Sequence, residues 1–240
     1  FVTDIGGRTS HTAIIAKSLN VPAVVGLKDA TLKISNGDFL IVDGQKGLII
    51  INPDRSTREQ YIKEQTKITE KIEKLDDIKD LPAQTQDGKL IHLLANIELL
   101  NEVQTAKKYG ALGVGLYRTE FLYMNRQDLP TEEEQYQAYK KVAEALNNQI
   151  LTIRTLDIGG DKFLSSVQIP KEMTAFLGAR AIRFCLDRTD IFKTQLRAIL
   201  RASVHGNIQL MYPMISGLGE LRQANAILNE VKQNLKNEQI

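Results

Sequence analysis

From residue 88 onward, apolar strand-like runs alternate with helical segments, and this rhythm constrains the fold more than any other feature of the chain. Parallel strands need a crossover, which is usually a helix, so the alternation predicts a parallel sheet. Strands are expected at Leu90–Asn96, Gly113–Tyr117, Ile150–Ile153 and Asn207–Tyr212. Helices are expected at Asn101–Tyr109, Thr131–Leu146, Phe176–Asp187 and Ile191–Ser203. A (β/α)₈ barrel needs about 250 residues, so this region predicts little more than half of one.

The first part of the chain predicts a small α/β unit followed by a long helix. A compact helical pattern covers Thr12–Leu19, and the strand-like pieces are Ala23–Val25, Phe39–Val42 and Leu48–Ile51. Asn52-Pro53-Asp54 is a helix-start signal, and the polar stretch after it continues to Asp80. Within that stretch a stripe that can pack against a neighbour recurs at helical spacing: Tyr61, Gln65, Ile68, Ile72 and Leu75.

Composition excludes several classes of function. The net charge is +2, from 31 basic and 29 acidic side chains, which gives no reason to expect nucleic acid or an anionic membrane as partner. One cysteine, Cys185, excludes an intrachain disulfide and suits a reducing compartment such as the cytoplasm. Apolar runs such as Leu48–Ile51 are far too short for membrane insertion. Phe1 opens directly onto a motif, and we expect it to be a cut end.

The strongest local signal is the run from Gly6 to Ala16, with His11 at its centre. Two glycines allow a tight turn, and Ser10 can cap the helix that follows, which puts His11 in its first turn. The positive end of a helix disfavours imidazolium and attracts anions, so this placement favours a neutral, nucleophilic ring able to carry a phosphoryl group. An isolated Ser-His pair would more often be a surface or capping feature.

A second signal is repeated: two apolar strands each end in Arg-Thr, at Arg118 and at Arg154. In a barrel the carboxyl ends of the strands form the active-site face, so both arginines are expected at one mouth. Guanidinium forks suit phosphate and carboxylate groups better than lysines do. For either arginine alone, an exposed salt bridge would be an equally good explanation.

These stretches resemble the phosphoenolpyruvate-utilising enzymes, which include Enzyme I of the sugar phosphotransferase system, pyruvate phosphate dikinase and phosphoenolpyruvate synthase. Gly6–Ala16 resembles their phosphohistidine motif. The segment Arg154–Lys162 is similar to Enzyme I in particular, because the dikinase lacks its Asp-Ile-Gly-Gly-Asp-Lys ending. Further matches to Enzyme I are Val21–Gly26, Asp128–Gln135 and Phe176–Arg183.

The resemblance implies an α/β architecture in three parts within an internal piece of a longer protein. Residues 1–52 would be the C-terminal part of a small phosphohistidine domain that swivels, and residues 53–82 a linker helix. Residues 83–240 would be the first half of a TIM-type barrel that binds phosphoenolpyruvate. Since half the barrel would then be missing, the isolated chain is expected to be inactive.

The resemblance also implies an activity and a set of site residues. His11 would accept phosphate from phosphoenolpyruvate and pass it to the phosphocarrier protein HPr, the first step of sugar uptake. Arg118, Arg154 and Arg180 would bind phosphoenolpyruvate. The family needs Mg²⁺, whose ligands would lie on later barrel strands beyond this chain, and the complete barrel would form a homodimer.

Two rivals stay open at this point. A dikinase or synthase would use His11 to shuttle phosphate between ATP and pyruvate, and a regulatory relay protein would bind phosphoenolpyruvate without transferring anything. Several other residues are interpreted as structural. Cys185 is expected to be a buried small hydrophobe, and the acidic residues near the mouth are expected to orient arginines rather than bind metal. The residues given such structural roles are His92, Glu120, Asp157, Asp161, Arg183, Cys185, Arg197, Arg201 and His205.

Overall fold

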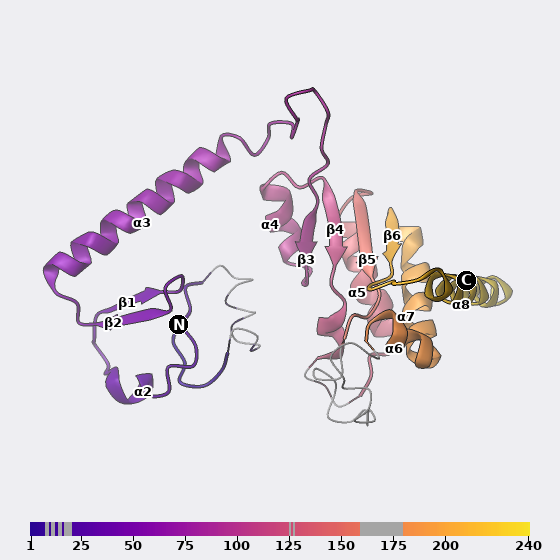
Figure 1. Cartoon of the computed structure of the whole chain (residues 1–240), viewed down its shortest axis with the longest axis horizontal. Helices are drawn as coiled ribbons and strands as arrows, with labels where there is room; N and C mark the ends of the chain where they lie inside the picture. The colour runs from indigo at the N-terminus through magenta and orange to yellow at the C-terminus, as the bar shows by residue number, and fades with distance from the viewer. Residues whose placement is uncertain are drawn as a thin grey trace. The chain divides into compact units, whose positions relative to one another are not determined.

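The computed structural model describes the chain except residues 8–9, 11–12, 14–15, 17–20, 125, 127 and 159–179. It divides into two compact units, Phe1–Lys79 and Asp80–Ile240. The long helix belongs to the first unit, and the four-stranded parallel sheet belongs to the second (Figure 1). Among the described helices, none is long and apolar enough to cross a membrane.

The first unit is a small α/β structure built around one hairpin. Strand β1 (Leu40–Asp43) pairs antiparallel with β2 (Leu48–Ile51), and the short helix α2 (Ala30–Lys33) precedes them. The two predicted strands are therefore confirmed to within one residue at each end. The third predicted strand is reduced to a single bridge between Val24 and Val2, and α2 was not predicted. Most of the predicted helix Thr12–Leu19 lies outside the described residues.

Helix α3 (Arg55–Asp76) begins where the sequence predicts. The side chain of Asp54 accepts a hydrogen bond of 2.7 Å from the backbone amide of Thr57, which satisfies one of the free amides at the helix start. Within the first unit the stripe that can pack against a neighbour is exposed: α3 has no buried residue, and Ile68 and Leu75 are 48% and 52% exposed. Its amphipathic pattern alone could not reveal whether another part of the chain lies against it.

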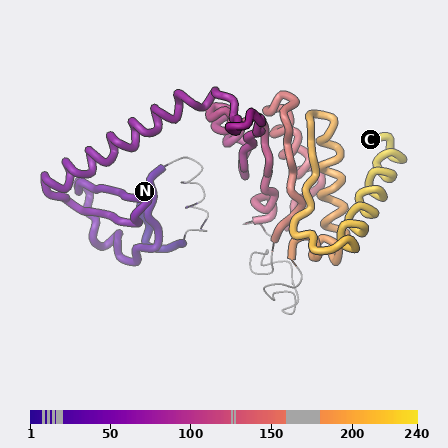
Figure 2. Tube along the Cα trace, turned by 45° about the horizontal axis from the view of Figure 1, so that its top comes forward, coloured from indigo at the N-terminus to yellow at the C-terminus, as the bar shows by residue number. Residues whose placement is uncertain are grey.

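The second unit contains a four-stranded parallel sheet with the order β3-β4-β5-β6, as the strand–helix alternation predicts (Figure 1). The strands are β3 (Ala95–Ile97), β4 (Gly113–Tyr117), β5 (Ile150–Arg154) and β6 (Ile208–Met211). The described helices are α4 (Glu102–Lys108), α5 (Glu132–Ala145), α6 (Ile182–Asp187), α7 (Thr189–Ala202) and α8 (Leu218–Asn237), with short 3₁₀ turns η1 (Glu120–Tyr123) and η3 (Ser203–His205). The tube view shows the strands following one another across the unit in chain order (Figure 2).

The sequence prediction was wrong at the start of this sheet. A strand was expected over Leu90–Asn96, but β3 begins only at Ala95, and Leu90 instead forms an antiparallel bridge with Gln84. Leu93 is 56% exposed, so an apolar run here is not a buried strand. The run leads into β3, which pairs with β4 and stands at one edge of the described sheet. Of the predicted helix Phe176–Asp187, only Ile182–Asp187 is a described helix, and residues 176–179 lie outside the described part.

Two hydrophobic clusters hold the second unit together. The first lies between the sheet and helices α5 and α7, with members such as Val114, Leu151 and Tyr139 that are fully buried. The second joins the end of β5 to α6, α7 and α8 through residues such as Leu156 and Phe192. Close packing also fixes the start of β4, because a Cβ on Gly113 would come within 2.6 Å of the carbonyl oxygen of Ile150. The strand ends are thus placed by a well-packed core.

Helix α5 begins with a capping box at Thr131. The hydroxyl of Thr131 accepts a hydrogen bond from the amide of Glu134, and the carboxylate of Glu134 accepts one from the amide of Thr131. This reciprocal pair satisfies two free amides at the helix start, and three glutamates in the first turn suit the helix dipole. The hydrogen bond donated by the amide of Thr131, followed by those from the Thr131 hydroxyl and from Arg126, lowers the pKa of the Glu134 carboxyl.

Candidate active site

Arg118 and Arg154 lie at the carboxyl ends of neighbouring parallel strands. Arg154 is the last residue of β5, and Arg118 directly follows Tyr117, the last residue of β4. Tyr117 pairs in register with Ile153, so the two arginines belong to the same edge of the sheet. The backbone amide of Arg118 also donates a 3.0 Å hydrogen bond to the carbonyl of Ile97 at the end of β3. Arginines from two strands therefore flank one edge.

Arg154 is held by two carboxylates. Its Nη2 donates to Glu120 Oε1 at 2.7 Å, and its Nη1 lies 2.9 Å from Asp157 Oδ2. Glu120 Oε1 also accepts from the backbone amide of Asp157 at 3.2 Å, so the two acids are tied to each other. The side chain of Arg154 is only 20% exposed, and its Nε is buried without a hydrogen-bond partner among the described residues. The two carboxylates therefore fix the direction of this guanidinium.

The other two arginines are more exposed. Arg118 is 45% exposed and donates to one carboxylate, Glu98, at 2.6 Å. Arg180 is 46% exposed, and its Nε lies 3.6 Å from Asp157 Oδ1, which is an ion pair beyond hydrogen-bond distance. Asp157 therefore joins Arg180 to Arg154, and all three predicted arginines lie near the strand ends. Planar donors of this kind suit an anion that carries phosphate and carboxylate groups.

Further polar atoms near this edge have no hydrogen-bond partner within the part of the chain that the structure describes. They are the buried hydroxyl oxygens of Thr155 and Tyr212, at the ends of β5 and β6, which accept and donate no hydrogen bond there, and Asp157 Oδ1, whose contact with Arg180 is the 3.6 Å ion pair. Burial raises the pKa of Tyr212 to about 12, so its hydroxyl stays protonated and able to donate at neutral pH. Unsatisfied buried polar groups are rare in folded proteins, and these lie together at the strand ends.

A buried polar network lies beneath the same edge, and the sequence analysis missed it. Gln195, on α7, accepts from the amide of Leu156 at 2.9 Å and donates to the hydroxyls of Thr119 and Tyr139 at 3.1 and 3.2 Å. Thr119 Oγ1 in turn donates to the carbonyl of Arg154 at 3.0 Å. Thr119 and Gln195 are both fully buried. The available signal was a glutamine among the apolar residues of α7, flanked by Leu196 and close to Phe192 in sequence.

His11 lies outside the described residues, but its neighbours are described. Ser10 Oγ accepts a hydrogen bond of 3.3 Å from the amide of Ala13, which confirms the predicted cap. Gly26 has a φ of +78°, and a Cβ there would come within 2.6 Å of the carbonyl oxygen of Gly6. The glycine turn before Ser10 is therefore packed closely against a second glycine, where a larger residue would not fit.

The described residues do not fit a metal site. Among them there is no group of three His, Cys, Asp or Glu side chains that could hold an ion. Glu120 and Asp157 already contact Arg154, which agrees with the prediction that they orient arginines. Asp161, the third acidic residue considered, lies outside the described residues.

Cys185 is the buried small hydrophobe that the sequence predicts. Its Sγ lies 3.7 Å from the carbonyl oxygen of Leu156, and burial raises the pKa of the thiol to about 12. A thiol with such a pKa is a poor nucleophile at neutral pH. The structural interpretation of the histidines holds for His205, whose ring lies 3.0 Å from the hydroxyl of Tyr136. His92 was expected inside a strand, but it lies in the exposed run before β3.

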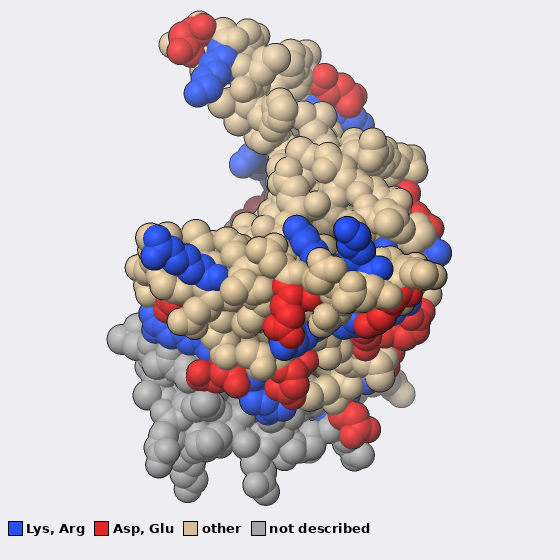
Figure 3. Space-filling model, turned by 90° about the vertical axis from the view of Figure 1, so that its right-hand side faces the viewer, with Lys and Arg blue, Asp and Glu red and all other residues tan. Residues whose placement is uncertain are grey.

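The remaining predicted packing residues form ion pairs between helices. Arg197 pairs with Glu132 and Glu238 at 2.6 Å, and Arg201 pairs with Glu132 and Glu133 at 2.7 Å. Basic and acidic side chains accordingly lie interspersed on the face shown in Figure 3. Hydrogen bonds from Arg197 lower the pKa of the Glu238 carboxyl. These arginines join α5, α7 and α8 and are not directed to the strand ends.

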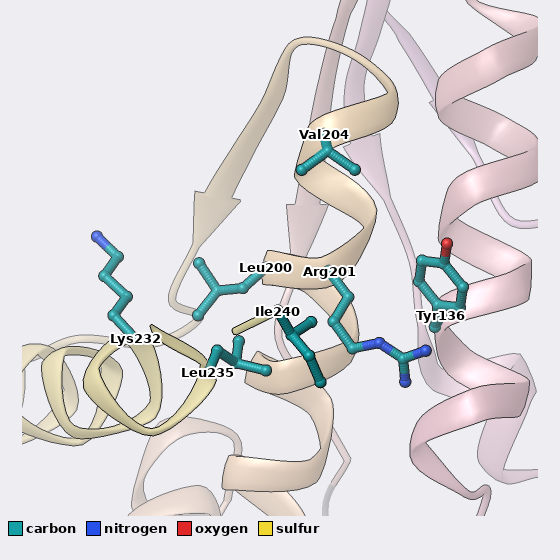
Figure 4. A pocket seen from close by; sticks show the side chains of 7 residues that line it. All are labelled: Tyr136, Leu200, Arg201, Val204, Lys232, Leu235 and Ile240. Carbon is teal, nitrogen blue, oxygen red and sulfur yellow. The ribbon is translucent and has the colours of Figure 1, made fainter. Parts of the chain in front are cut away.

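A hollow of about 410 Å³ lies among helices rather than at the strand ends. Its lining comes mainly from α7 and α8, and the guanidinium of Arg201 points across it toward Tyr136 of α5 (Figure 4). Arg201 stacks on the Tyr136 ring at 4.2 Å, in addition to its two carboxylate partners. The cation is thus already engaged, and the rest of the lining is mostly apolar: Leu200, Val204, Lys232, Leu235 and Ile240.

Comparison with known proteins identifies the class. Residues 72–240 match the PEP-binding domain of the PEP-utilising enzymes, and residues 1–47 match the mobile domain of the same family. The chain therefore belongs to the phosphoenolpyruvate-utilising enzymes.

Within that family, the chain is similar to proteins that share one name. The chain is 53% identical over 235 residues to the phosphoenolpyruvate-protein phosphotransferase of Geobacillus stearothermophilus, covering 98% of this chain. It is 50% identical over 238 residues to the protein of the same name from Staphylococcus aureus, covering 99% of this chain. The chain spans 41% and 42% of the lengths of these two relatives.

Proposed function

We propose that the complete protein transfers a phosphoryl group from phosphoenolpyruvate to His11 and then to the phosphocarrier protein HPr. The observation that carries this proposal is the set of Arg118, Arg154 and Arg180 at the strand ends of the family's PEP-binding region. The relatives' shared name, phosphoenolpyruvate-protein phosphotransferase, supports a protein as acceptor. It favours this activity over that of a dikinase or synthase.

The arginines account for substrate binding. Phosphoenolpyruvate carries a phosphate and a carboxylate, and two or more guanidinium groups can bind both ends of it. Arg154 is oriented by Glu120 and Asp157, so it binds in a defined direction, while Arg118 and Arg180 adapt to the ligand. The same charges stabilise the phosphoryl oxygens as the bond to the leaving oxygen breaks.

His11 is the proposed nucleophile. One ring nitrogen attacks phosphorus, the bond between phosphorus and the enol oxygen breaks, and the enolate takes up a proton to give pyruvate. The cap at Ser10 supports a helix start beside His11, which favours the neutral ring and stabilises the anionic product. Transfer to HPr then returns the ring to its free form.

The proposed architecture follows the sequence prediction. Residues 1–52 belong to a swivelling phosphohistidine domain, residues 53–82 to a linker helix and residues 83–240 to the first half of a TIM-type barrel. The parallel sheet and the two family matches support this division. The complete protein is proposed to be a cytoplasmic homodimer of the sugar phosphotransferase system. It would require Mg²⁺ bound by residues beyond this chain.

One experiment tests the activity. The full-length protein is incubated with ³²P-labelled phosphoenolpyruvate and Mg²⁺, and the label is located by phosphopeptide mapping. Label is expected on His11, and it should be lost in His11→Ala and transferred to HPr from the parent protein. Label that persists in His11→Ala would exclude the proposal. A crosslink that fixes the two domains should abolish one of the two transfers, and unchanged turnover of both would refute the swivel.

A further inference from the structure

The fully buried pair Thr119 and Gln195 connects the two strand ends that carry the candidate arginines. Thr119 is the residue after Arg118, and its hydroxyl donates to the carbonyl of Arg154. Gln195 donates to Thr119 and accepts from the amide of Leu156, two residues after Arg154. Three hydrogen bonds of 2.9 to 3.1 Å thus link the end of β4, the end of β5 and helix α7.

From this geometry we infer that Gln195 and Thr119 are positioning residues for phosphoenolpyruvate binding, which rests on the proposed function. They do not touch the ligand. They fix the backbone from which Arg118 and Arg154 extend, so the two guanidinium groups keep one mutual spacing. A misplacement of about 1 Å can reduce a reaction rate about 100-fold, so that spacing matters to the reaction.

Packing alone does not account for a glutamine at this place. Gln195 lies in a cluster of apolar side chains that includes Phe192 and Leu196, where a leucine would be the ordinary choice. The polar atoms of its amide group are engaged: Oε1 accepts once and Nε2 donates twice. A buried amide satisfied in this way specifies a single arrangement of the groups around it, which an apolar side chain cannot do.

The same network contains a matched control. Gln135, on α5, is 1% exposed and accepts from the hydroxyls of Tyr123 and Tyr139, while its Nε2 donates to the carbonyl of Pro130. It is therefore a buried glutamine with three hydrogen bonds, like Gln195. It shares the Tyr139 hydroxyl with Gln195, but none of its three hydrogen bonds goes to a strand-end group beside the arginines. Changing either glutamine to leucine removes a buried amide of similar size.

The test compares these variants in the full-length protein. Gln195→Leu is expected to lower the rate of His11 phosphorylation by phosphoenolpyruvate about 10–100-fold, chiefly through a higher KM. Gln135→Leu should stay within about 3-fold of the parent, although both variants lose buried hydrogen bonds and unfold at lower temperatures. Equal losses of rate in the two variants, or no loss in Gln195→Leu, would overturn the inference.

Two variants of Thr119 test the same inference even if Gln195→Leu fails to fold. Thr119→Val keeps the shape and removes the hydroxyl, whereas Thr119→Ser keeps the hydroxyl, so phosphorylation should fall in the first and recover in the second. Transfer of phosphate already on His11 to HPr should be unchanged in both, since it does not use the arginines. Valine behaving like serine would overturn the inference. Absence of phosphorylation in the parent protein would instead refute the proposed function.

Discussion

The ends of β4 and β5 carry the same Arg-Thr pair in two different environments. Arg154 is 20% exposed and contacts two carboxylates, whereas Arg118 is 45% exposed and contacts one. The threonines differ too, since Thr119 is bonded within the buried network while Thr155 Oγ1 has no partner in the described structure. One sequence motif therefore yields a fixed arginine on one strand and an adaptable one on its neighbour.

The largest effect is expected at the fixed arginine. Arg154→Met should lower the rate of phosphorylation by phosphoenolpyruvate about 1,000-fold, because it removes an oriented donor and leaves Glu120 and Asp157 without their shared cation. Steady-state kinetics of the full-length protein measure this effect. Retention of most of the activity would show that the end of β5 is not part of the site.

A smaller loss is expected at the adaptable arginine. Arg118→Met should lower kcat/KM for phosphoenolpyruvate about 10–100-fold, which corresponds to one or two hydrogen bonds to a charged ligand. Its exposed side chain has less orientation to lose than Arg154. If the two methionine variants were equally impaired, the difference in burial would have no functional meaning.

Substitutions of Glu120 and Glu98 test whether the orientation of Arg154 matters to the reaction. Glu120→Gln should lower kcat/KM about 10-fold, since it weakens the charge-assisted bond that directs Arg154. The matched control is Glu98→Gln, which alters the exposed pair with Arg118 and should change the rate less than about 3-fold. The reverse order of these two effects would contradict the comparison.

The smallest effect concerns stability and a pair away from this edge. Hydrogen bonding to Arg183 lowers the pKa of Glu220 to about 2, with a further contribution from the amide of Ser216. A carboxyl with a lowered pKa stabilises the fold above its ordinary pKa of 4.5, and this contribution is lost as the pH falls toward 2. Thermal unfolding of Glu220→Gln should therefore show a lower Tm at pH 7 and a shrinking difference below pH 4.5. A difference that is constant with pH would contradict this assignment.

Local signals predicted much of the fold. The strand–helix alternation predicts the parallel sheet, and the caps at Asp54 and Thr131 fix two helix starts, because these features depend on residues near in sequence. The limits of β3 and the exposure of the α3 stripe could not be predicted in this way. Both features depend on which distant parts of the chain pack against an apolar run. The periodicity of the sequence does not contain that information.

The residues of the candidate site also differ in how far the sequence could predict them. The arginines could be predicted because each ends a recognisable strand, and the resemblance gives them a role. The partners that orient them could not, since Glu120 is 34 residues from Arg154 and Gln195 is 76 residues from Thr119. A glutamine on an apolar helix face does not indicate a positioning role until the strand ends that it contacts are known.

The pairing of Arg118, Arg154 and Arg180 with Glu98, Glu120 and Asp157 has a consequence for how a substrate arrives. Each cation already has an acidic neighbour, so these side chains project little net field into solvent, and fields of that kind act over only about 10 Å at 0.1 M salt. An anion is then captured by short-range fit after it has diffused into the mouth, rather than attracted from afar. The association rate should therefore vary little with ionic strength.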